Sequence, residues 1–135
     1  MHHSPNTYRD LPALVIEDQP LIAWEVEGLL RDMGFEKIVV ACTAPAAILA
    51  YQSQPPKLIV TDLHLGYREE SAFSALKQID RQSQVAKVIV TGSDMNDDVQ
   101  ELLTAPNCVL VRKPFDPEDL RGAVQKVLVS MHGPN

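Results

Sequence analysis

Charged and hydroxyl side chains stand at the ends of four short apolar runs in the sequence. Glu17 and Asp18 close the first run, and Asp62 closes the run "LIVTD". Thr91 ends "VIVT", and Lys113 follows "CVLVR". Three carboxylates held close together would repel one another unless a cation joined them, and a hard divalent ion with oxygen ligands is the natural one. If the fold brings these ends together, the residues predict a Mg²⁺ site with an ammonium and a hydroxyl beside it.

The apolar runs are short and rich in β-branched residues, which is typical of buried strands. Five of them follow one another along the chain, at residues 13–17, 37–41, 57–61, 86–91 and 108–111. Helical patterns lie between and after them, over 20–33 before Gly34 and beyond the cap candidates Thr43, Ser71, Ser93 or Asp94, and Asp116. Strands that alternate with helices at this pace form a parallel sheet with helices on both faces. We therefore expect a five-stranded, doubly wound α/β domain.

The expected fold places a site at one edge of its sheet. In open α/β sheets ligands bind outside the carboxyl ends of the strands, and the acids, Thr91 and Lys113 all stand at such ends. Taken alone, each of these residues is better explained as a turn former or a helix cap. Their coincidence at four strand ends favours a functional site, because turn chemistry predicts no particular order of acid, acid, hydroxyl and base.

Length and composition narrow the class of protein. The 135 residues suffice for one domain, and 45% hydrophobic with 22% charged residues is a normal globular balance. We expect a flexible segment over 1–12, a domain over 13–131 and a tail over 132–135. No apolar run reaches the roughly 18 residues of a membrane span, so we expect no membrane association and a cytoplasmic location.

The two cysteines and the net charge bear on partners. Cys42 and Cys108 lie beside apolar neighbours, which predicts buried reduced thiols and no structural zinc. The formal net charge is −6, and the sequence contains no cluster of Lys and Arg residues. Both features argue against nucleic-acid binding. The partner that this composition favours is a protein.

The motifs "LVIED", "LIVTD", "VIVTG" and "VRKPF" together resemble the receiver domains of two-component response regulators, of the stand-alone type, over about Leu14 to Leu128. The resemblance implies the flavodoxin-like (βα)5 fold of receivers. It implies that Asp62 is the phosphoacceptor, that Thr91 is the switch hydroxyl, and that Lys113 is the lysine of such sites, with a cis peptide before Pro114. The metal ligands that it implies are Glu17, Asp18, Asp62 and the backbone carbonyl of His64.

The implied chemistry uses each residue type. Asp62 would take a phosphoryl group from a sensor histidine kinase, a histidine phosphotransfer protein or a small phosphodonor, with Mg²⁺ bridging the oxygens. Lys113 and Thr91 would meet the remaining phosphoryl oxygens. Such a domain catalyses its own phosphorylation and dephosphorylation, and we expect no turnover of a separate substrate.

The implied function is phosphorylation-dependent binding of a downstream protein, or service as a phosphate shuttle or sink. The resemblance leaves a homodimer open. The alternative is a pseudo-receiver that binds a protein without being phosphorylated. A phosphatase of the haloacid dehalogenase type is disfavoured, because His64 stands where that family needs a second Asp.

Two residues depart from the expected pattern or stand out from it. Leu110 occupies a position that is commonly Tyr or Phe in receivers, and we expect it to be buried without taking part in switching. Trp24, the only tryptophan, falls opposite the apolar sector of its helix, where Ile22 and Val26 lie. We therefore expect Trp24 to face outward, as an anchor for a partner or for self-association. The alternative is that its ring folds back over a neighbouring helix, for which Gly28, one turn on, leaves room.

Overall fold

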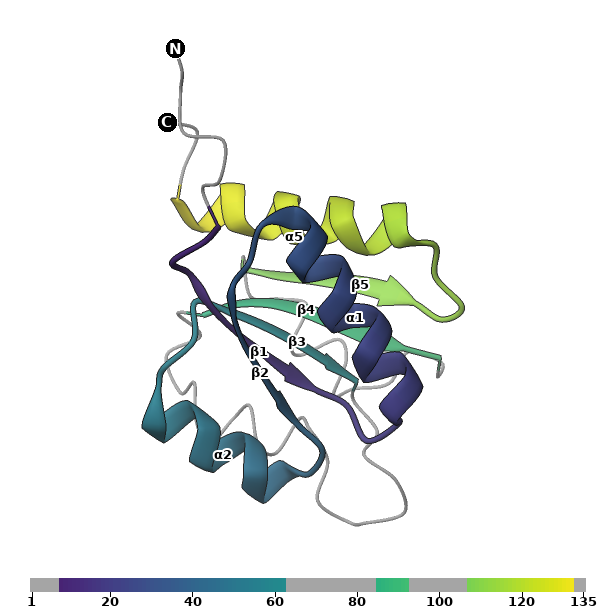
Figure 1. Cartoon of the computed structure of the whole chain (residues 1–135). Helices are drawn as coiled ribbons and strands as arrows, with labels where there is room; N and C mark the ends of the chain where they lie inside the picture. The colour runs from purple at the N-terminus through teal and green to yellow at the C-terminus, as the bar shows by residue number, and fades with distance from the viewer. Residues whose placement is uncertain (1–7, 63–84, 93–106, 133–135) are drawn as a thin grey trace.

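The computed structural model describes residues 8–62, 85–92 and 107–132, with side chains up to Val129. Its centre is a five-stranded sheet in which every pairing is parallel and the order is β2-β1-β3-β4-β5 (Figure 1). The strands are β1 Pro12–Ile16, β2 Lys37–Ala41, β3 Leu58–Asp62, β4 Ala86–Thr91 and β5 Cys108–Arg112. This order is found in flavodoxin-like doubly wound sheets, which confirms the predicted fold class.

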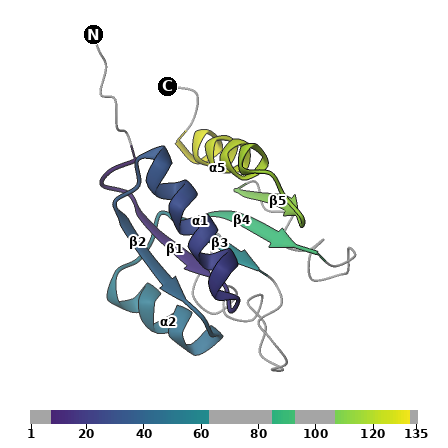
Figure 2. The same ribbon diagram turned by 45° about the vertical axis from the view of Figure 1, so that its right-hand side comes forward.

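Three described helices cover the two faces of the sheet. α1 (Pro20–Met33) and α5 (Pro117–His132) lie side by side on one face, and α2 (Ala44–Ser53) lies on the other (Figures 1 and 2). The alternation of side chains along the strands divides the core accordingly. On β1, Val15 packs with the helices α1 and α5, whereas Ile16 packs with α2. The helices predicted after Ser71 and after Ser93 or Asp94 lie outside the described residues.

The helix ends follow the predicted signals. Gly34 ends α1 in the left-handed region with a φ of 114°, and its amide donates to the carbonyl of Arg31. The hydroxyl of Thr43 accepts a hydrogen bond from the amide of Ala46, which caps α2. Before α5, the amide of Asp116 donates to the carboxylate of Asp119, half of a capping box. The caps at Thr43 and Asp116 follow the carboxyl ends of β2 and β5, so they fix how the chain turns into a helix at the site edge.

Burial differs from expectation at three positions, and all of them lie on or next to edge strands. Cys42, which follows β2, is exposed, so the expectation of a buried thiol is wrong there; Cys108 is partly buried, and both thiols are free. Leu110 in β5 is only partly buried, against the α2-side core. Edge strands have a neighbour on one side only, so their side chains keep more contact with water.

Two further observations concern the N-terminal segment and Trp24. The rings of Tyr8 and Phe35 stack with centroids 4.8 Å apart, and Leu11 also packs against the core, so part of the segment expected to be flexible is packed. Trp24 is 72% exposed, which confirms that it faces outward. No helix within 8–62, 85–92 and 107–132 is both long and apolar enough to cross a membrane.

Candidate functional site

The site lies at the carboxyl ends of β1 and β3, where the strand order reverses. These strands are neighbours, and their register pairs Ile16 with Thr61. The next residues, Glu17 and Asp62, therefore leave the sheet side by side. In doubly wound sheets this switch point is where a crevice opens, because the connections from the two strands run to opposite faces.

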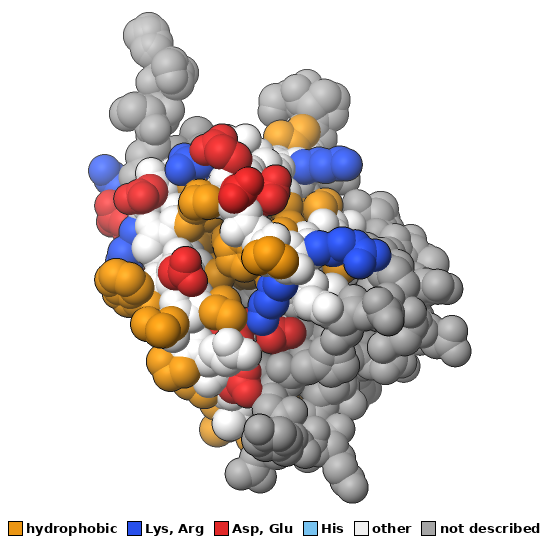
Figure 3. Space-filling model, turned by 90° about the vertical axis from the view of Figure 1, so that its right-hand side faces the viewer, with side chains coloured by type: hydrophobic (Ala, Val, Ile, Leu, Met, Phe, Trp, Pro, Cys, Tyr) orange, Lys and Arg blue, Asp and Glu red, His pale blue; other side chains and the backbone are white. Residues whose placement is uncertain are grey.

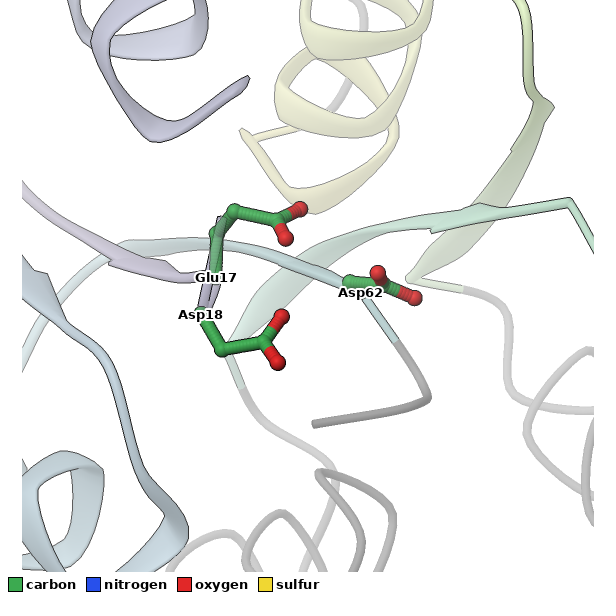
Figure 4. A group of neighbouring side chains, drawn as sticks. All are labelled: Glu17, Asp18 and Asp62. Carbon is green, nitrogen blue, oxygen red and sulfur yellow. The ribbon is translucent and has the colours of Figure 1, made fainter. Parts of the chain in front are cut away.

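Three carboxylates converge there. Glu17, Asp18 and Asp62 each bring an oxygen to within 4.8 Å of the others, and Figure 4 shows the side chains of Glu17 and Asp18 both directed toward the side where Asp62 lies. Glu17 and Asp62 are buried, while Asp18 is half-buried. Oδ1 of Asp18 is nevertheless buried and has no hydrogen-bond partner among the described residues. An acceptor in that condition needs a cation or a further hydrogen-bond donor.

Lys113 supplies the positive charge of the site. Its Nζ lies 2.8 Å from Oδ2 of Asp62 and 3.7 Å from Oε1 of Glu17. The backbone amide of Lys113 donates to the carbonyl of Thr91 at 2.9 Å, and the peptide to Pro114 is cis, as the resemblance implied. The lysine stem runs past Gly92, where an added Cβ would lie 3.6 Å from the Cβ of Lys113. The ends of β4 and β5 thus hold the ammonium over Asp62.

The proton affinities of the site reflect this crowding. Burial raises the pKa of Glu17 from 4.5 to about 7; the amide of Gln19 opposes the shift and the charge of Asp62 adds to it. For Lys113, burial alone would lower the pKa, but the hydrogen bond and charge of Asp62, with the charges of Glu17 and Asp18, raise it above its usual value. The lysine therefore stays charged, whereas near neutral pH the carboxyl group of Glu17 is about half protonated.

The donor set fits a hard divalent cation. Carboxylate oxygens are the ligands that Mg²⁺ prefers, and three carboxylates exceed the single ammonium in charge. The orphaned Oδ1 of Asp18 and the raised pKa of Glu17 are both features that a cation would relieve. Glu17, Asp18 and Asp62 are the described residues that would hold it. His64, expected to contribute a carbonyl, lies outside the described residues.

Thr91 and two residues that the sequence reasoning did not consider complete the site. Thr91 is buried at the end of β4, and its backbone carbonyl accepts a hydrogen bond from the backbone amide of Lys113. The buried hydroxyl of Thr61 donates to the carbonyl of Asp62 at 3.0 Å, and the amide of Gln19 donates to Glu17 at 3.2 Å. Thr61 could have been noticed in the sequence, because it is a polar residue inside an apolar run. The hydrogen bond from the backbone amide of Gln19 could not, because every residue except proline has such an amide.

This fold and site define a doubly wound α/β protein with a carboxylate and lysine centre at its switch point. Residues 13–125 match the model of the response regulator receiver domain, and the chain belongs to that family. It is therefore a receiver domain of the two-component type, as the motifs indicated.

The chain is similar to several characterised receivers. It is 29% identical over 119 residues to the phyllosphere-induced regulator PhyR of Methylorubrum extorquens, covering 85% of this chain and 42% of that protein. The receiver domain of PhyR from Erythrobacter litoralis superposes with a TM-score of 0.74 at 28% identity, covering 93% of this chain and 95% of that one. The anti-anti-sigma factor PhyR from Bartonella quintana gives a TM-score of 0.70 at 28% identity, covering 87% and 47%. The chain spans about half the length of the curated relatives it matches.

Proposed function

We propose that this receiver takes a phosphoryl group on Asp62 and in that state binds a protein partner. The 2.8 Å contact between Nζ of Lys113 and the carboxylate of Asp62, next to two further acids, carries the proposal. An isolated buried carboxylate would destabilise the fold. A carboxylate that faces an ammonium and a cation site is instead positioned to react with a phosphoryl group.

The proposed donor is a phosphohistidine on a sensor histidine kinase or a histidine phosphotransfer protein. An oxygen of Asp62 forms the new P–O bond as the P–N bond breaks, and the imidazole nitrogen keeps the electron pair and takes up a proton. Lys113 stays protonated and offers its N–H groups to the phosphoryl oxygens, and Thr91 contributes its hydroxyl. Glu17, Asp18 and Asp62 would hold Mg²⁺, which would neutralise charge on the transferred group.

The proposed output is recognition of a protein by the phosphorylated receiver, in the cytoplasm. The similarity to PhyR supports this, since one PhyR is an anti-anti-sigma factor and so acts on a protein. A net charge of −6 supports a protein rather than a nucleic acid as the target. A shuttle or sink for phosphoryl groups would use the same acceptor chemistry without an output partner.

The decisive experiment is intact-mass spectrometry after incubation with acetyl phosphate and Mg²⁺. The wild type should gain one phosphoryl group, and Asp62→Asn should gain none. Asp10→Asn, an exposed acid outside the site, is the matched control and should be labelled like the wild type.

Excess EDTA should suppress the labelling, because the acids need a cation before a phosphoryl group can approach. Labelling of Asp62→Asn, or labelling that EDTA leaves unchanged, would contradict the mechanism. A wild type that takes no phosphoryl group from acetyl phosphate or phosphoramidate would instead favour a pseudo-receiver.

A further inference from the structure

A buried hydroxyl directly precedes Asp62 in the chain. It belongs to Thr61, which is 1% exposed. The register partners of Thr61, Ile16 in β1 and Ile89 in β4, are both part of the apolar cluster on the α2 side of the sheet. Because side chains that are paired in register share a face of the sheet, the hydroxyl of Thr61 lies among apolar groups. A hydroxyl in such surroundings destabilises the fold unless it is hydrogen-bonded.

The hydrogen-bond partner of this hydroxyl is the backbone of the next residue. Oγ1 of Thr61 donates to the backbone carbonyl of Asp62 at 3.0 Å. The bond closes a small ring of atoms that contains the ψ torsion of Thr61 and both the φ and ψ torsions of Asp62. The direction in which the Asp62 side chain leaves the backbone depends on the ψ torsion of Thr61 and the φ torsion of Asp62. The hydroxyl therefore constrains the direction of the carboxylate through the backbone.

This constraint acts at a residue that the sheet pairs on one side. Pairing of β3 with β1 ends at Thr61, opposite Ile16, whereas pairing of β3 with β4 continues to Asp62, opposite Val90. The side on which the pairing has ended is the side of β1, and β1 leads to the other two acids of the site. The hydrogen bond from Thr61 thus adds a constraint where the ladder toward those acids has stopped.

The position of the Asp62 carboxylate matters because several charged groups converge on it. Its oxygens lie 2.8 Å from Nζ of Lys113 and within 4.8 Å of carboxylate oxygens of Glu17 and Asp18. Figure 3 views the molecule from the side toward which the strands point, and both acidic and basic side chains reach the surface there. Thr61 is buried beneath this surface, so it does not contact a phosphodonor. Its effect on the chemistry passes through the position of Asp62.

We propose that Thr61 is a positioning residue, whose hydroxyl holds Asp62 in the orientation that the cation and the incoming phosphoryl group require. Its effect on the labelling rate rests on the proposed phosphorylation of Asp62, whereas its effect on cation binding needs only the three carboxylates. A misplacement of about 1 Å can slow a reaction about a hundredfold. Loss of one of several constraints on Asp62 should therefore slow labelling by about fivefold to tenfold.

Two substitutions of Thr61 separate positioning from stability. Thr61→Val keeps the branched shape and loses the hydroxyl. It should unfold at nearly the urea concentration of the wild type, because a methyl group among apolar side chains offsets the lost hydrogen bond. Its labelling by acetyl phosphate in Mg²⁺ should nevertheless be about fivefold to tenfold slower. Thr61→Ser keeps the hydroxyl and loses a methyl group, so it should unfold at less urea but be labelled within about twofold of the wild-type rate.

Mg²⁺ binding, measured by titration calorimetry without a phosphodonor, gives a second result that requires no phosphoryl transfer. Thr61→Val should bind Mg²⁺ at least about threefold more weakly than the wild type, because a carboxylate of the cation site is held less firmly. Thr61→Ser should bind it like the wild type. The matched control is Ile89→Val, which removes a methyl group from the register partner of Thr61. It should unfold at less urea with an unchanged labelling rate and Mg²⁺ affinity.

Two results would assign Thr61 to packing alone. One is wild-type labelling and Mg²⁺ affinity in Thr61→Val. The other is a labelling rate that follows the unfolding midpoint, so that Thr61→Ser and Ile89→Val are slowed as well. If the wild type takes up no phosphoryl group, the proposed function fails, and the Mg²⁺ affinities of the Val and Ser variants still decide whether Thr61 positions Asp62.

Discussion

Nζ of Lys113 and Oδ2 of Asp62 lie 2.8 Å apart although the strands that lead to them, β5 and β3, are separated by β4. The lysine reaches across the end of β4, where its own amide is bonded to the carbonyl of Thr91. This backbone hydrogen bond anchors the base of the lysine at the end of β4, from where its side chain reaches the carboxylate that we propose to be the phosphoacceptor.

Lys113→Met should slow the labelling of Asp62 by acetyl phosphate at least about tenfold, because a cation aimed at the phosphoryl oxygens is lost. It should also lower the free energy of unfolding by about 1.5 to 3 kcal/mol at pH 7, since the buried acids lose a charged hydrogen-bond donor. Intact-mass kinetics and urea unfolding measure the two effects. Lys126→Met, an exposed lysine of α5, is the control; a variant at 113 that matches it in both measurements would remove Lys113 from the mechanism.

Glu17 should make the stability of the metal-free protein depend on pH. Its pKa is raised from 4.5 to about 7, so the folded state holds a proton that the unfolded state releases. The stabilisation is present below pH 4.5 and is lost as the pH rises to about 7, which amounts to about 3 kcal/mol. In EDTA, Glu17→Gln should lack this part of the decline, whereas Glu25→Gln should keep it. Parallel pH profiles for wild type and Glu17→Gln would show that Glu17 ionises normally.

Leu110→Ala should lower the free energy of unfolding by about 1 to 2 kcal/mol, less than the loss at a fully buried leucine, because the side chain is only partly buried. Labelling of Asp62 should persist, since Leu110 touches the core and not the carboxylates. Leu49→Ala, at a leucine 64% exposed, should change stability by less than about 0.5 kcal/mol. Loss of labelling at unchanged stability would instead give Leu110 a role in the site.

The two thiols should differ in reactivity. Cys42 is exposed, whereas burial raises the pKa of Cys108 to about 11, so little of its thiolate forms at pH 8. Iodoacetamide should modify one thiol quickly in the native protein and both in urea, as read by intact mass. Cys42→Ser should remove the fast reaction, and a fast reaction that survives in this variant would place Cys108 in contact with solvent.

The strand ends were predictable from the sequence because each buried strand is a run of β-branched residues and each site residue follows such a run. Cys42 and Leu110 show what was not predictable. Both belong to apolar stretches, but β2 and β5 are the two edges of the sheet, and strand order is set by packing between distant segments and not by the composition of one run. The raised pKa of Glu17 could not be predicted from the sequence either, because it is caused mainly by burial, which also depends on packing between distant segments.

The stack of Tyr8 on Phe35 bears on where this domain should be cut. The match to the receiver family begins at residue 13, and a fragment that starts there keeps every described site residue. Such a fragment would uncover one side of the Phe35 ring, which is 1% exposed in the intact chain, and would lose the salt bridge from Arg9 to Glu36. The start of the family match thus lies inside the packed part of the chain, and fusions or domain swaps with other receivers should retain the chain from Tyr8.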